Sequence, residues 1–171
     1  MTASAPSRLR LMTDSDLATV LEWRNHPNVR RFMHAQHIIS KDEHSRWFER
    51  TSVDPQRHLL IYQEGRQPRG FVSIHEIGSG GIADWGFYAA PHSPSGTGRA
   101  LGHAALQHAF STLRLYKMCG QVLAYNELSI RFHLHLGFVK EGVLRQQHFD
   151  GETYHDIWCF GLLSDRWLVN P

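Results

Sequence analysis

A glycine-rich loop followed by an apolar helix most limits the folds open to this chain. Residues 93–110 read SPSGTGRALGHAALQHAF, which places Gly96 and Gly98 directly before a run dense in alanine and leucine. The first turn of a helix has unpaired N–H groups and a partial positive charge, and glycines there let an anion approach the backbone. The spacing matches neither the dinucleotide fingerprint nor the triphosphate-binding loop. The stretch therefore predicts either an anion-binding helix start or a flexible turn before a packed helix.

Length and composition fit one ordinary domain with a core. The chain has 171 residues, of which 42% are hydrophobic and 20% charged, and its formal net charge is +2. Because the basic residues are scattered, nucleic-acid binding and membrane-surface binding are not expected. Cys119 and Cys159 favour a reduced, cytoplasmic chain, and no apolar run is long enough to span a membrane. We expect residues 1–7 to form a flexible tail and residues 8–171 a single domain.

The part of the chain before the glycine loop predicts a strand, two helices and three further strands. The first strand comprises residues 8–12, and a capping box at Thr13 and Asp16 opens the first helix. Pro27 disfavours helical angles in the residue before it, so this helix is expected to end in a loop bordered by Arg24, Asn25 and His26.

Ser40 and Glu43 form a second capping box, which opens a helix through Trp47 and Phe48. After this helix the spacing of hydrophobic residues changes from the period of a helix to the alternation of a strand. Turn-rich stretches separate three strands of an antiparallel meander, over residues 58–63, 70–77 and 82–90.

Beyond the loop, helices and strands alternate up to a closing hairpin. Asn126 and Gly137 cap a short helix, and Asp150-Gly151 forms the hairpin turn. The expected elements are a helix over 99–112, a strand over 118–125, a helix over 127–136, and strands over 143–149 and 153–163.

Two motifs in this order resemble the GCN5-related N-acetyltransferase superfamily. SGTGRALG is similar to that family's pyrophosphate loop, and NELSIRFHLHLGF to its Asn-x-x-Ser/Ala…Gly-Phe segment. The resemblance covers about residues 8–163. It implies an α/β (α+β) fold class, the acyl-CoA N-acyltransferase fold, with a central mixed, mostly antiparallel sheet of about seven strands flanked by helices. Ser93 departs from the Arg or Gln usual at its position, although backbone N–H groups do most of the phosphate binding.

The resemblance implies acetyl-CoA as co-substrate and no metal. Its pyrophosphate is expected at the glycine loop, and its pantetheine arm beside the end of strand 82–90, where that strand splays from strand 118–125. For Phe87, simple core packing is the alternative. The cofactor-binding residues expected from the family are Phe87, Tyr88, Ala89, Gly96, Thr97, Gly98, Arg99, Ala100, Asn126, Ser129 and Phe132.

Acyl transfer requires a neutral amine, a stabilised oxyanion and a proton for the leaving thiolate. The family commonly places a tyrosine acid seven residues beyond the Asn, and here His133 occupies that position. Histidine, with an ordinary pKa of about 6.5, can serve as the acid, with Ser129 one turn before it; a surface histidine is the alternative. Gln121 replaces a frequent carboxylate and is expected to orient the amine or a water. The base stays open among Glu76, Asp84, His44 and water.

Within the superfamily, LEWRNHPNVRRFM and DWGFYAAP resemble the pseudaminic acid biosynthesis acetyltransferases. This resemblance implies transfer to the 4-amino group of UDP-4-amino-4,6-dideoxy-N-acetyl-β-L-altrosamine for flagellin glycosylation, in the cytoplasm, by an enzyme that is a candidate homodimer. The acceptor-binding residues expected are Arg24, Asn25, His44, His75, Glu76 and Tyr88. A solvated salt bridge is the alternative for Arg24. Two other functions remain open: N-terminal acetylation of a ribosomal protein, and acyl-CoA sensing without catalysis.

Overall fold

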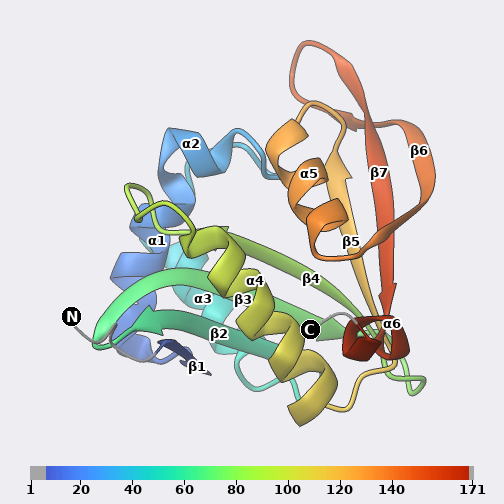
Figure 1. The fold of residues 1–171 in the computed structure, drawn as a ribbon. Coiled ribbons are helices and arrows are strands. Elements are labelled where there is room, and N and C mark those ends of the chain that lie inside the picture. The colour runs from blue at the N-terminus through green and yellow to red at the C-terminus, as the bar shows by residue number, and fades with distance from the viewer. Residues whose placement is uncertain (1–6, 170–171) are drawn as a thin grey trace.

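The computed structural model describes residues 7–169, which build a seven-stranded sheet with helices on both faces (Figure 1). The strand order is β1-β2-β3-β4-β5-β7-β6, and only the β4–β5 pair is parallel. The expected mixed, mostly antiparallel sheet is therefore confirmed. The strands are β1 (Ser7–Leu11), β2 (Arg57–Glu64), β3 (Gln67–Glu76), β4 (Ile82–Ala89), β5 (Lys117–Leu123), β6 (Val139–Phe149) and β7 (Tyr154–Leu163).

Several helical segments differ from the sequence prediction. The expected loop after α1 contains the short helix α2, since Pro27 suits the first position of a helix as well as it ends the one before. The helix after the glycine loop begins at Thr97, earlier than expected, and its last five residues widen into a π-helix, η2. The helices are η1 (Asp14–Asp16), α1 (Leu17–Asn25), α2 (Pro27–Arg30), α3 (Lys41–Thr51), α4 (Thr97–Gln107), η2 (His108–Thr112), α5 (Glu127–His135) and α6 (Ser164–Val169).

Local signals at the N-terminal end account for most element boundaries there. The Thr13–Asp16 capping box is formed in both directions. At α3, Ser40 accepts a hydrogen bond from the Glu43 N–H (3.1 Å), whereas the Glu43 carboxylate binds His37 instead of closing a second box. Residues 1–6 of the expected tail lie outside the described residues, and Ser7 already pairs with Glu64 in the sheet.

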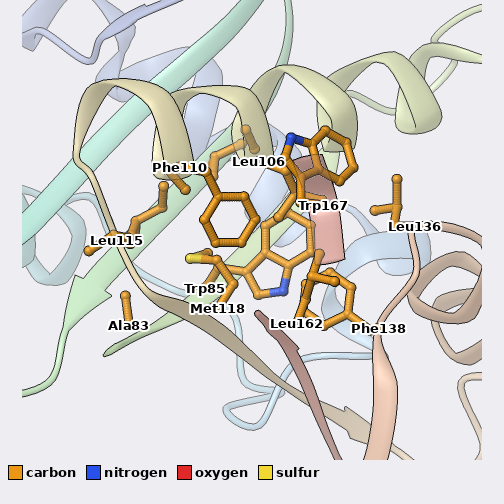
Figure 2. Close-up of a cluster of buried hydrophobic side chains, with 14 of the residues drawn as sticks. Ala83, Trp85, Leu106, Phe110, Leu115, Met118, Leu136, Phe138, Leu162 and Trp167 are labelled. Atoms are coloured by element: carbon orange, nitrogen blue, oxygen red, sulfur yellow. The ribbon is translucent and has the colours of Figure 1, made fainter. Parts of the chain in front are cut away.

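The sheet separates two hydrophobic cores. On one face, α1 and α3 cover Leu59, Ile61 and Phe71; on the other, α4 and the end of α5 cover Trp85, as Figure 1 shows for the helices. Figure 2 shows the second core, which gathers Trp85 and the following side chains: Leu106, Phe110, Met118, Phe138, Leu162 and Trp167. Trp167 comes from α6, a helix that the sequence analysis did not predict.

Close packing of α4 on α5 brings the two motif-bearing helices together. A Cβ at Gly102 would lie 2.5 Å from Cζ of Phe132, so only glycine fits at this contact. The glycine loop that begins α4 is thereby held near the Asn-capped start of α5.

The parallel pair β4–β5 is short and opens the sheet. Only Ile82–Asp84 pair with Lys117–Cys119, and beyond Asp84 the two strands diverge (Figure 1). β5 continues along β7 as far as Leu123, while the rest of β4 stays paired only with β3. The end of β4, Trp85–Ala89, therefore has one backbone edge without a neighbouring strand.

Candidate active site

The space between the diverging strands is a cavity of about 630 Å³, which we call the wedge cavity. The ends of β4 and β5, the start of α4, α5 and the segment after α2 surround it. Most of the residues expected to bind the cofactor or to catalyse transfer come together here. Those on its wall are Phe87, Tyr88, Ala89, Gly98, Gln121, Asn126, Ser129, Phe132 and His133.

The start of α4 offers unpaired donors to this cavity. Gly96 has a φ of 90°, and a Cβ at Gly96 or Gly98 would meet no atom within 4 Å. Within the described residues, the amides of Gly98 and Arg99 have no hydrogen-bond acceptor, and the buried Thr97 hydroxyl has no partner. The Ala100 N–H, by contrast, already binds the Gly96 carbonyl (3.0 Å). These open amides at a helix N-terminus fit the pyrophosphate of coenzyme A.

The start of α5 is fixed by its cap. The Asn126 side chain accepts a hydrogen bond from the Ser129 N–H (3.2 Å), and the Ser129 hydroxyl lies 3.5 Å from Nδ1 of His133. The expected alignment of these three side chains along one face of the helix is therefore present.

His133 is not placed as an acid. It is 2% exposed, and its Nε2 accepts a hydrogen bond from the indole N–H of Trp85 (3.2 Å). Because an indole nitrogen can only donate, the proton of the ring must sit on Nδ1, where it is donated to the Ser129 carbonyl (2.8 Å). Burial lowers the pKa of His133 to about 4. The ring is neutral near pH 7, and its one proton is donated to the Ser129 carbonyl, so the structure does not support the expected acid role.

Aromatic side chains pack around this histidine. The Phe87 ring lies 4.5 Å from that of Trp85 and 4.8 Å from that of Phe132, measured between centroids. The side chain of Phe87 thus has the packing role that was its alternative, and the residue also lines the wedge cavity.

A second cavity of about 470 Å³, the side pocket, lies between β4 and α3. It shares Met33, Gly86, Phe87 and Tyr88 with the wedge cavity. The two spaces therefore meet across the end of β4, as a donor site and an acceptor site must for direct transfer.

Three expected acceptor-binding residues line the side pocket and three do not. Arg24, His44 and Tyr88 lie on its wall, whereas Asn25 uses both ends of its amide on the backbone of Ile39 (2.8 Å each). Asn25 thereby holds residues 31–39, which we call the strap.

His75 and Glu76 are outside both cavities. His75 pairs with Asp84 across β3 and β4, near the fork of the wedge. Glu76 binds His58 (2.8 Å) on the α4 side of the sheet, so the structure does not support acceptor binding by Glu76. Of the open base candidates, Asp84 lines the wedge cavity, and burial raises its pKa.

The side pocket has unpaired polar atoms and a positive rim. Arg24 donates through Nη2 to the Ala35 carbonyl of the strap (2.6 Å), while its Nη1 and Nε2 of His44 are buried without a partner among the described residues. Burial lowers the pKa of His44 and raises that of Tyr88.

Sequence reasoning assigned only His44 of α3 to the acceptor and missed four other residues of this helix. Glu43, Arg46, Trp47 and Arg50 all line it. Their spacing of three, four and seven residues puts them on one helix face, which was the available signal. Arg46 and Arg50 are exposed at the rim.

Within the described residues there is neither a metal-ligating group of side chains nor a membrane-spanning helix. In residues 7–169, no three His, Cys, Asp or Glu side chains are grouped as a metal ion requires. No helix of that part of the chain is both long and apolar enough to cross a bilayer.

Comparisons with known proteins agree with this geometry. The family model described as acetyltransferase (GNAT) domain matches residues 7–139. Spermidine N(1)-acetyltransferase of Vibrio cholerae is 25% identical over 163 residues, 94% of each chain, and acetyltransferase PseH of Campylobacter jejuni is 22% identical over 149 residues, 84% of this chain and 86% of that one.

The fold is likewise similar to solved structures. The crystal structure of the Vibrio cholerae spermidine N-acetyltransferase in complex with CoA and spermine has a TM-score of 0.88 at 24% identity, covering 95% of this chain and 98% of that one. The wedge cavity and the open start of α4 are the features that a family of acetyl-CoA-dependent enzymes needs. The chain belongs to the GNAT acetyltransferase family and is an acetyl-CoA-dependent N-acetyltransferase.

Proposed function

We propose that this N-acetyltransferase acetylates the amino group of a UDP-linked amino sugar, the 4-amino group of UDP-4-amino-4,6-dideoxy-N-acetyl-β-L-altrosamine. The observation that carries the proposal is the positive charge of the side pocket. Arg24, Arg46 and Arg50 line it, and its carboxylate, Glu43, lies 3.0 Å from His37. A diphosphate is attracted to such a rim, whereas a polyamine is repelled.

The relatives allow both kinds of acceptor. The Vibrio cholerae relative is a spermidine acetyltransferase, and the Campylobacter jejuni relatives are acetyltransferases named PseH. A cationic acceptor needs carboxylates near the amine, and Glu43 alone among the side-pocket residues has one. The charge of the pocket therefore favours the anionic acceptor.

In this proposal each cavity has one task. Acetyl-CoA, when bound in the wedge cavity, supplies the thioester carbonyl that the acceptor amine attacks. The amides of Gly98 and Arg99 bind its anionic end, and the free edge of β4 orients the pantetheine arm. The amine reaches the carbonyl from the side pocket across Gly86.

Proton transfer is assigned to water and hydroxyl groups. Gln121 on the wall of the wedge cavity orients a water that accepts the amine proton. Ser129, which lines the same cavity, relays a proton to the leaving thiolate. His133 is a positioning residue, because its neutral ring joins α5 to Trp85.

Release of free CoA from acetyl-CoA tests the proposal with three acceptors: the UDP-amino sugar, spermidine and a ribosomal-protein N-terminal peptide. We expect kcat/KM at least about 100-fold higher for the UDP-amino sugar, which corresponds to about 3 kcal/mol. An equal or higher value for spermidine or the peptide contradicts the proposal. CoA binding without release from any amine would indicate a sensor.

Rim variants provide the matched control. Arg50→Ser is expected to raise KM for the UDP-amino sugar about ten-fold without changing the affinity for CoA, since its charge faces the acceptor only. Arg66→Ser removes an equally exposed arginine from the β2–β3 turn and should leave KM unchanged.

A further inference from the structure

Two residues of the side pocket each carry a buried polar atom without a partner. Five such side-chain atoms occur among the described residues, and Nη1 of Arg24 and Nε2 of His44 are the two on residues that line this pocket. His44 is 6% exposed, so water does not compensate it from the surface. Because buried polar groups in folded proteins nearly always have partners, these two atoms indicate a ligand that supplies them.

The chemistry of the two atoms is complementary. Arginine is a donor only, and its Nη2 is already engaged with the strap. The neutral form of His44 is favoured by burial and by the nearby Arg24 charge, and Nε2 of its ring has no partner among the described residues. With the ring proton on Nδ1, Nε2 is an acceptor. The residues that line the pocket therefore include one unpaired donor and one unpaired acceptor.

The surroundings of the pair are apolar. Met33, Ile39, Trp47 and Phe71 line the same pocket, and the Trp47 ring stacks on that of His44 with centroids 5.1 Å apart. A group that satisfies the pair and fills this space has a carbonyl, an N–H and a methyl. A secondary acetamide combines all three, whereas a hydroxyl leaves the apolar wall empty.

We propose that Arg24 and His44 recognise the acetamido group of the acceptor sugar, with Nη1 of Arg24 donating to its carbonyl and its N–H donating to Nε2 of His44. The inference rests on the proposed function and adds to it the group that selects the sugar. Arg24 lies beside Tyr88, which borders both cavities, so the acetamide is bound within a sugar ring's reach of the transfer point. Arg46 and Arg50 at the rim then face the diphosphate.

Calorimetry on the full chain with CoA present, which cannot transfer acetyl, tests the assignment. The probes are UDP-4-amino-4,6-dideoxy-N-acetyl-β-L-altrosamine and its analogue with a hydroxyl in place of the acetamide. We expect the wild type to bind the acetamido sugar at least about ten-fold more tightly, because the analogue leaves buried groups unpaired. In His44→Phe this preference should shrink several-fold, because only the Arg24 donor remains for the acetamide. His44→Gln, which keeps an acceptor near the position of Nε2, should retain part of the preference.

The outcomes separate the two proposals. Equal affinities in the wild type, or a preference that is undiminished in His44→Phe, overturn the acetamide site and leave the UDP-amino sugar as acceptor. No binding of either nucleotide sugar, while CoA still binds, overturns both. Unchanged CoA affinity in His44→Phe establishes that the variant is folded, and if it is not, Arg24→Lys, which keeps the charge, replaces it in the same comparison.

Discussion

The buried His133 is expected to make the protein lose stability in acid. Its pKa is lowered by burial from 6.5 to about 4 in the folded chain. As the pH falls below 6.5, the unfolded chain binds a proton that the folded chain does not, so the free energy of unfolding decreases between pH 6.5 and pH 4. The whole shift corresponds to about 3 kcal/mol, of which about 2 kcal/mol is lost by pH 5.

His133→Phe isolates this contribution, because phenylalanine keeps a ring and does not titrate. At pH 7.5 the variant should be less stable than the wild type by about 1–3 kcal/mol, since the Trp85 N–H loses its buried acceptor. At pH 5 this gap should shrink by about 2 kcal/mol. Other titrating groups are common to both proteins and cancel in the comparison.

Urea unfolding at pH 7.5 and pH 5, followed by tryptophan fluorescence, measures both numbers. His135→Phe is the control, because His135 lies on the same helix with its side chain exposed. If the wild type and His133→Phe lose equal stability between the two pH values, the claim that the His133 ring is neutral and hydrogen-bonded at both nitrogens is refuted.

Three further substitutions test other parts of the account. Gly98→Ala should raise the free energy of unfolding by up to about 1 kcal/mol and weaken CoA binding about ten-fold in calorimetry, because the Cβ stabilises the helix and covers the open amides. Gly120→Ala should lower stability in urea by about 1–3 kcal/mol, since its Cβ would lie 2.6 Å from Nε2 of His133, whereas Gly142→Ala, with no atom within 4 Å, should not. Asn25→Ala should raise the acceptor KM about ten-fold in steady-state kinetics without altering CoA affinity, because the strap loses both bonds at Ile39.

Local sequence signals predicted the parts of the fold that depend on neighbouring residues. From the capping box at Thr13, the Asn126 cap and the alternation of hydrophobic residues, most elements could be predicted as a helix or a strand. The loop at Gly96 and Gly98 was also readable, because its function depends on the absence of side chains next to a helix start.

Contacts between distant segments were not readable. The role of His133 is set by Trp85, 48 residues away, and nothing in RFHLHLGF indicates an indole donor. Asn25 was expected at the acceptor, but both ends of its side-chain amide are hydrogen-bonded to the backbone of Ile39, 14 residues further on. Glu76 was expected at the acceptor together with His75, although successive residues of a strand face opposite sides of the sheet.

A competition assay tests the central claim most directly. The protein is given acetyl-CoA with equal concentrations of the UDP-amino sugar and spermidine, and mass spectrometry quantifies both acetylated products. The positive side pocket predicts acetylated sugar nucleotide in large excess, with the excess shrinking as salt screens the arginines. Predominant acetylspermidine at low salt would contradict the account.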